Sequence, residues 1–369
     1  MTEPAIPEHL RRERTVPAKL PDNFTPQFPS YMARYPQSTT DLVMAIFGAQ
    51  FPARSENDHI SGAISKLASF LSSELQDSSN QPRFHETASV VDASGYYNET
   101  LIAYWSSATT YRCWARESGF EKWWDALDPE KEANGWFIEV FLPSIDRVET
   151  IASHNDRAEG VVHMRESFSG PVLEHIYWGS VRDRFPASQT DRLAGDKVDW
   201  DVSEDVADRP RRVRVPGIRN LTVIRSGQDW SDTEPEERKL YHSELHVTLT
   251  KGMNFLRDHG PEVGCFSCRL MDITDPATGK ADRDRTFGLA YFDELASLER
   301  WSKKHTTHLN IFHGFYKYVG KLNGIIKLRL NHEVFVLKPE QQFLEYIGCH
   351  PSTGVLTAVN GHPGFKKLD

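Results

Sequence analysis

Hydrophobic and polar residues alternate most regularly over residues 326–337. One side of this predicted strand carries Ile326, Leu328, Leu330, His332, Val334 and Val336, and the other carries Lys327, Arg329, Asn331, Glu333, Phe335 and Leu337. Successive side chains of a strand point to opposite faces. His332 is therefore predicted to point with the aliphatic residues into the core, where a polar ring needs a partner.

The spacing of apolar residues predicts two similar series of elements. In the first half we expect strands at 42–51, 83–92, 100–105 and 135–141, with helices at 58–75 and 107–117. In the second half we expect strands at 221–226, 263–273, 286–292 and 326–337, with helices at 233–258 and 294–304 and a further helical segment from His308. Ser231 or Thr233 is expected to cap the long helix, and Gly260 to end it.

Both series have the order βαββαβ, which predicts an α+β protein made of two ferredoxin-like repeats. Two such sheets in one chain can close into a barrel or a sandwich. We expect an irregular, proline-rich arm at 1–38, which lies on the main body, a first half at 39–189 and a second half at 217–369. The polar residues 190–216 are expected to connect the halves on the surface.

Composition narrows the class of protein. The chain has 369 residues, 26% of them charged, and a net charge of −9. That charge disfavours nucleic acid as a partner. No apolar run could span a bilayer and the first 18 residues lack the apolar core of a signal peptide, so we expect a cytoplasmic enzyme.

The four cysteines do not indicate a disulfide scaffold or a covalent haem motif. Cys265 and Cys268 form a CxxC within a predicted strand. Positions three apart on a strand face opposite sides, so we do not expect them to share a zinc ion.

Candidate chemistry centres on two histidines. His308 heads an apolar helical face, which suits an axial ligand to a flat, apolar cofactor such as haem. A core or capping histidine is the alternative, and His305 and His313 compete for the ligand role. His332 could be a second ligand, a general acid or base beside the iron, or a hydrogen-bonded core residue.

Two further segments carry polar candidates. Ser226 ends a predicted strand before Gly227, and it could hydrogen-bond a substrate or serve only in a turn. Residues 177–186 mix aromatic residues with Arg182, Asp183 and Arg184, which indicates either an anion-binding arginine or a solvated turn. Glu149 has no distinguishing pattern of its own.

Together these segments resemble the haem-containing aldoxime dehydratases, the phenylacetaldoxime dehydratase family. The resemblance covers about residues 25–356 and is carried by YWGSVRDRFPASQTD (177–191), IRSGQDW (224–230), EERKLY (236–241), LERWSKKHTTHLNIF (298–312), KLRLNHEV (327–334) and CHPSTG (349–354). It implies non-covalent haem b in a ferredoxin-like α+β barrel. Asn331 stands where some members have an aromatic residue, which bears on substrate preference.

The resemblance also implies residue roles. His308 would be the proximal iron ligand and His332 the distal acid and base. Ser226 would hydrogen-bond the aldoxime hydroxyl, Arg184 matches the distal arginine, and Glu149 matches the acidic residue near the distal histidine.

The implied reaction converts an aldoxime into a nitrile and water at ferrous haem. The rival classes are a peroxidase-like or chlorite-splitting haem enzyme and a non-enzymatic haem carrier or sensor. We expect a small-molecule aldoxime as the substrate. We expect neither nucleic acid nor a membrane as a partner. The sequence is compatible with a homodimer.

Overall fold

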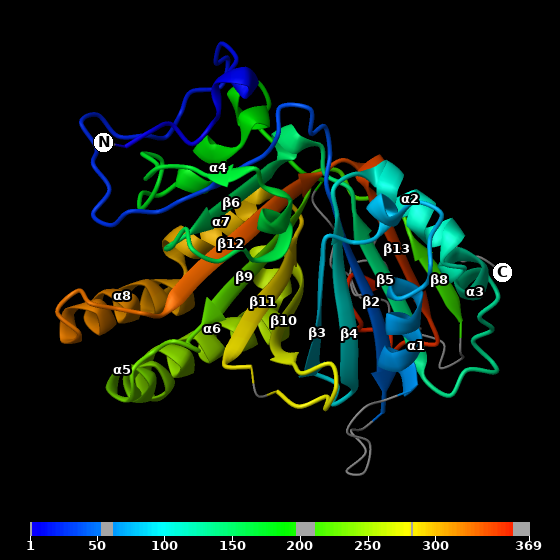
Figure 1. Cartoon of the computed structure of the whole chain (residues 1–369). Coiled ribbons are helices and arrows are strands. Elements are labelled where there is room, and N and C mark those ends of the chain that lie inside the picture. The colour runs from blue at the N-terminus through cyan, green and yellow to red at the C-terminus, as the bar shows by residue number, and fades with distance from the viewer. Residues whose placement is uncertain (1, 53–61, 197–210, 282, 357–369) are drawn as a thin grey trace.

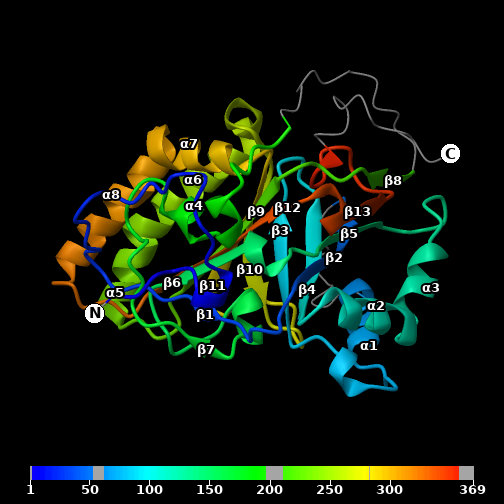
Figure 2. The same cartoon turned by 90° about the horizontal axis from the view of Figure 1, so that it is seen from above.

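The computed structural model describes residues 2–52, 62–196, 211–281 and 283–356. Within these residues an eleven-stranded sheet curls through the molecule in the order β6-β12-β9-β11-β10-β3-β4-β2-β5-β13-β8. Every neighbouring pair of strands in it is antiparallel. Helices α1–α3 lie at one end of this sheet and α6–α8 at the other (Figures 1 and 2).

The first-half elements agree closely with the sequence. The strands are β2 (Val43–Phe51), β3 (Phe84–Val91), β4 (Tyr97–Trp105) and β5 (Gly135–Phe141), and the helices are α1 (Gly62–Leu71) and α2 (Ala108–Glu117). The predicted helix at 58–75 ends four residues early, and its predicted start lies outside the described residues. The sequence missed helix α3 (Phe120–Asp125), whose Phe120 and Trp124 are buried.

The second half contains β9 (Leu221–Asp229), β10 (Cys265–Thr274), β11 (Arg285–Phe292) and β12 (Arg329–Leu337). The predicted long helix is α5 (Pro235–Leu240) and α6 (His246–His259), joined by one π-helical turn, Tyr241–Leu245. Its N-cap is Glu234 rather than Ser231 or Thr233, and Gly260 follows its last residue. Two helices, α7 (Leu295–Lys304) and α8 (Thr306–Lys321), precede β12.

The two halves exchange strands. Strand β6 (Val148–Ala152) comes from the first half of the chain but pairs with β12. Strand β13 (Gln342–Ile347) comes from the second half but pairs with β5, and with β8 (Arg212–Val215) on its other side. Because these three strands are short and pair with distant partners, the sequence did not predict them.

The remaining elements are short. Strand β1 (Ala33–Arg34) pairs with β7 (Ser167–Phe168), and helix α4 spans Ser180–Arg184. Single 3-10 turns lie at Glu8–Leu10, Ser78–Asn80, Ile145–Arg147, Gly160–Met164, Pro186–Gln189, Gly260–Val263 and Pro339–Gln341.

Strand β12 is covered on both faces, whereas the sequence predicted that only the face carrying His332 points into the core. Glu333, Phe335 and Leu337 point into the curled sheet and are buried, Phe335 and Leu337 in a core that both halves share. Val334 and Val336 pack under the helix layer, in the same cluster as Leu295 and Trp301 of α7. His332 lies on this helix-covered face rather than in the central core.

The expectation that Cys265 and Cys268 face opposite sides of their strand is wrong. The pairing register of β10 with β11 shifts between Cys265 and Ser267. This bulge interrupts the alternation, so Cys265 and Cys268 both belong to the cluster under the helix layer.

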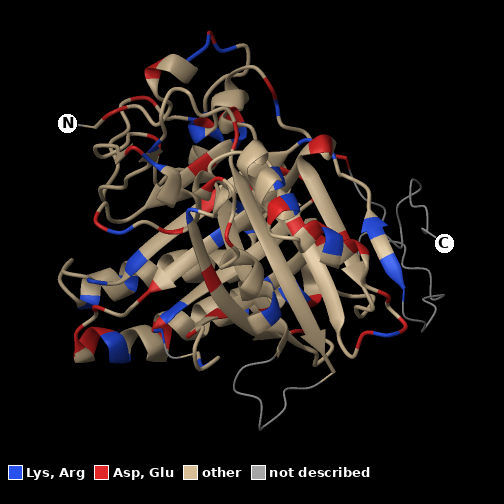
Figure 3. Cartoon of the chain, turned by 45° about the vertical axis from the view of Figure 1, so that its right-hand side comes forward, with Lys and Arg blue, Asp and Glu red and all other residues tan. Residues whose placement is uncertain are grey.

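The N-terminal arm packs on the body, as expected. Tyr31 forms a bridge with Ala152, the backbone N–H of Lys19 donates to Asp183, and the ring of Phe28 packs on that of Phe315. No helix in the described part of the chain combines the length and apolar character needed to cross a bilayer. Acidic and basic residues are interspersed in the view of Figure 3.

Candidate functional site

The candidate site begins at the register of three strands. His332 on β12 lies opposite Ser226 on β9 and opposite Ile151 on β6. Directly opposed residues of antiparallel strands share a face, with Cβ atoms about 4.5–5.5 Å apart. Ser226 and His332 are therefore side by side. Because β9 continues to Asp229, Ser226 lies within the strand, and the turn interpretation is wrong.

Glu149 and Arg184 converge on His332. Nε2 of His332 lies 2.8 Å from Oε1 of Glu149 and 3.2 Å from Nη2 of Arg184. Arg184 donates two hydrogen bonds to the same carboxylate, from Nε at 2.9 Å and from Nη2 at 3.1 Å. The exchanged strand β6 supplies Glu149, and the last residue of α4 supplies Arg184.

Burial strengthens the electrostatic interactions among Glu149, Arg184 and His332. The side chains of Glu149 and Arg184 are 0% and 1% exposed, whereas that of His332 is 22% exposed. Burial alone would raise the pKa of Glu149, but Arg184 and then His332 lower it to about 2. Glu149 is therefore an anion at neutral pH, and it can only accept hydrogen bonds.

The segment before Arg184 is held tightly as well. Nη1 of Arg184 donates to the backbone carbonyl of Glu174 at 2.9 Å. The next residue, His175, is half-buried, and burial, followed by the charge of Arg184, lowers its pKa to about 3. Ile176 has φ of +61°, which is strained for a β-branched residue. The sequence pattern gave no signal for His175, because the run around it has no helical or strand period.

His308 lies on the helix layer, in the first turn of α8. Its Nδ1 is buried and makes no hydrogen bond of normal geometry. Burial lowers its pKa to about 4, although the Ser302 backbone opposes the shift. His308 is thus a neutral imidazole, the form that binds metals.

The two competing histidines have other places. His305 is the N-cap of α8 and its Nδ1 accepts from the backbone N–H of Thr307. His305, and not His308, therefore caps α8. His313 is exposed. Of the three, only His308 has a buried ring nitrogen without a hydrogen bond of normal geometry.

One segment contacts both candidate regions. The ring of Trp178 lies 6.4 Å from that of His308 and 5.4 Å from that of Phe312 on α8. Six residues later the same segment places Arg184 against His332. One segment thus contacts His308 on the helix layer and His332 on the sheet face that this layer covers.

Apolar side chains around this region are only partly covered. The half-buried ones are Ile224 and Leu330 on the strands, and Ile311, Phe312 and Phe315 on α8. A flat, apolar group between sheet and helices would cover them, and His308 offers a neutral nitrogen to its metal. The residues present thus fit haem.

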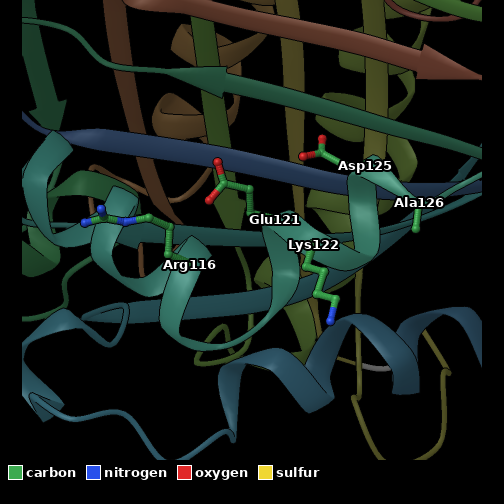
Figure 4. Close-up of a pocket in the computed structure, with 5 residues that line it drawn as sticks. All are labelled: Arg116, Glu121, Lys122, Asp125 and Ala126. Atoms are coloured by element: carbon green, nitrogen blue, oxygen red, sulfur yellow. The ribbon is translucent and has the colours of Figure 1, made fainter.

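A surface hollow lies far from these residues. It has a volume of about 570 Å³ and is lined by Arg116 of α2, by Glu121, Lys122 and Asp125 of α3, and by Ala126, which follows α3 (Figure 4). It is broad and open, and none of the candidate residues lines it.

Comparisons with known proteins show which family and which solved structures this chain resembles. The haem-containing dehydratase family matches residues 45–355. The chain is 37% identical to an aliphatic aldoxime dehydratase of Rhodococcus globerulus over 96% of this chain and 97% of that protein. It is 30% identical to a phenylacetaldoxime dehydratase of Bacillus sp. over 91% and 93% of the two chains. A crystal structure of an aldoxime dehydratase in complex with butyraldoxime is 35% identical, with a TM-score of 0.86 over 97% and 96% of the two chains.

Proposed function

The chain belongs to the haem-containing dehydratase family, and we propose that it converts aldoximes into nitriles and water at a haem held by His308. The observation that carries the proposal is the contact of His332 with the buried anion Glu149, directly opposite Ser226. A haem carrier would not need an acid and a hydroxyl placed side by side.

The geometry supports one arrangement of the protons on His332. A carboxylate only accepts and a guanidinium only donates, so Nε2 can satisfy one of its two neighbours. The contact with Glu149 is the shorter one, which favours a proton on Nε2. The second nitrogen, Nδ1, is then the atom that exchanges a proton with substrate.

Each residue then has a role in an elimination. The aldoxime R–CH=N–OH must lose hydroxyl from nitrogen and a proton from carbon, and hydroxide leaves poorly unless it is protonated. When bound, haem b supplies a ferrous iron that can coordinate the aldoxime nitrogen and donate electron density to it. Nδ1 of protonated His332 gives its proton to the departing oxygen, and in its basic form it accepts the carbon proton.

The neighbours of His332 position these transfers. Ser226 holds the aldoxime hydroxyl in line with His332. Glu149 fixes the ring orientation of His332, while Arg184 keeps Glu149 ionised. The elimination removes H+ from carbon and OH− from nitrogen as one water, so it causes no net oxidation or reduction and returns His332 to its starting protonation.

We also propose that the halves 39–189 and 217–369 are two ferredoxin-like units with a connection at 190–216 and an arm at 1–38. The support is the order of strands in the sheet. Numbered within each half, β12-β9-β11-β10 and β5-β2-β4-β3 both read 4-1-3-2. The strands β10 and β3 join the two units.

The test is turnover of butyraldoxime by dithionite-reduced holoenzyme without oxygen, in the wild type, His332→Ala and the control His313→Ala. We expect His332→Ala to keep its haem and its substrate-binding spectrum but to lose about 10²–10⁴-fold in rate. His313→Ala should match the wild type. Near wild-type turnover by His332→Ala would move the acid elsewhere, and a wild type that binds haem without turnover would favour a carrier.

A further inference from the structure

The corner between α7 and α8 is made by a single residue. His305 ends α7, where its N–H donates to the Trp301 carbonyl at 3.0 Å, and begins α8, where its carbonyl accepts from Leu309 at 3.0 Å. Phe255 of α6 stacks on the His305 ring, with centroids 4.0 Å apart. The first turn of α8, which carries His308, is therefore fixed to the end of α7.

A chain of side-chain hydrogen bonds crosses this corner. The indole N–H of Trp301 contacts Oγ1 of Thr307 at 3.2 Å, and Oγ1 lies 2.9 Å from Nδ1 of His305. An indole only donates, so Thr307 accepts from Trp301. The Thr307 hydroxyl then donates to Nδ1 of His305, which already accepts from the Thr307 backbone N–H.

This series of hydrogen bonds ends at Trp301, which contacts the proposed iron ligand. The ring of Trp301 packs edge to face with that of His308, with centroids 4.8 Å apart and an interplanar angle of 70°. Trp301 is buried. A metal-bound histidine is usually oriented by a hydrogen bond from the nitrogen that does not bind the metal. The Ser302 backbone approaches the His308 ring, but the buried Nδ1 of His308 makes no hydrogen bond of normal geometry.

From this geometry we propose that Trp301 and Thr307 are positioning residues for the haem ligand. Trp301 sets the rotation of the His308 ring by contact, and Thr307 fixes Trp301 through the bond from its indole N–H. The inference rests on the proposed function, because it takes His308 as the ligand. It adds two residues that act on the iron through His308 rather than on substrate.

The test compares Thr307→Val, which keeps the shape of the side chain but removes the hydroxyl, with Thr307→Ser, which restores it. Thr306→Val is the matched control, since Thr306 is the exposed neighbour in the same turn. The readouts are the iron–histidine stretching band of the ferrous holoenzyme by resonance Raman and the rate of haem transfer to an excess of apomyoglobin.

Thr307→Val should broaden or split the iron–histidine band and speed haem loss about 10-fold, within the range for lost outer-shell partners. Thr307→Ser and Thr306→Val should match the wild type. A wild-type band and a wild-type rate of haem loss in Thr307→Val would overturn the proposal. If Thr307→Val does not fold, Trp301→Phe, which keeps an aromatic ring but removes the indole N–H, is held to the same two criteria.

A separate variant tests the assumption beneath the proposal. His308→Gly should lose the iron–histidine band, and added imidazole should restore it. If His308→Gly keeps the wild-type band, the ligand assignment itself fails, whatever Thr307→Val does. The two failures are thus distinguishable without any measurement of turnover.

Discussion

At the scale of single residues, the two nitrogens of His332 meet different surroundings. Nε2 faces a fully buried ion pair, and the ring is 22% exposed on a face shared with Ser226. The charge of Glu149 therefore acts on a group that substrate can still reach. Loss of that charge should affect both stability and rate.

We expect Glu149 to make the protein acid-sensitive in a defined range. Its pKa is lowered from 4.5 to about 2, so its contribution to stability is complete above pH 4.5 and is lost as the pH falls toward 2. That contribution is on the order of 3 kcal/mol. Urea unfolding from pH 7 to pH 3 should show a smaller loss of stability for Glu149→Gln than for the wild type.

The control for this experiment is Glu166→Gln, which removes an exposed carboxylate. Its pH dependence should parallel that of the wild type. Glu149→Gln should already be less stable at pH 7, because it leaves Arg184 buried beside a neutral amide. Equal slopes for all three proteins would show that Glu149 is not the group that senses acid.

Local sequence patterns identified some of the site residues and not others. His332 was visible because one imidazole interrupted an aliphatic strand face. Glu149 was not, because its carboxylate is distinguished only by Arg184 and His332, which are 35 and 183 residues away in sequence. The resemblance to a family named it, but no local pattern did.

At the scale of elements, β9 is three residues longer than its apolar run predicted, and this extension settles the orientation of Ser226. The sequence of residues 227–229, Gly-Gln-Asp, does not favour a strand. It is a strand because β11 and β12 pair with it on both sides. Tertiary pairing overrode local preference here.

Gly227 should be intolerant of a side chain. A Cβ there would lie 2.6 Å from Oδ1 of Asn331, which precedes His332. We expect Gly227→Ala to cost about 1–3 kcal/mol as an overpacked site and to slow turnover by displacing β12. Thermal unfolding and single-turnover rates measure the two effects.

Gly320→Ala on α8 is the matched control, because a Cβ there meets nothing within 4 Å. It should be neutral or stabilising by about 1 kcal/mol, since alanine favours a helix over glycine. If Gly227→Ala behaves like Gly320→Ala, Asn331 moves aside freely and the spacing of β9 and β12 does not constrain the site.

At the scale of the whole molecule, a buried polar cluster joins the halves. Arg269 on β10 grips Glu139 on β5 with two bonds of 2.7 Å. Tyr291 on β11 and Tyr346 on β13 donate to the same carboxylate. The sequence showed only separate charged and aromatic positions, because the cluster forms when the two halves of the sheet curl together.

We expect Arg269→Met to destabilise the protein by about 3–5 kcal/mol, because it leaves the carboxylate of Glu139 buried and unpaired. The double variant Glu139→Gln/Arg269→Met should recover much of that loss. Arg257→Met, which removes a largely exposed ion pair with Asp258, should change stability by less than about 1 kcal/mol. A double variant no more stable than Arg269→Met would contradict the pairing argument.

The strand exchange also has a consequence for synthesis on the ribosome. Arg184 precedes His332 by 148 residues, which at about 5–20 residues per second separates their emergence by roughly 7–30 s. During that interval Glu149 and Arg184 can pair, but β12, on which β6 docks, has not yet been made. Until then β6 has only its bridge to Tyr31 of the N-terminal arm, and the side that will pair with β12 exposes unpaired backbone groups, which favour aggregation. A chaperone that shields this edge would raise the yield of active enzyme more than one that acts only after release.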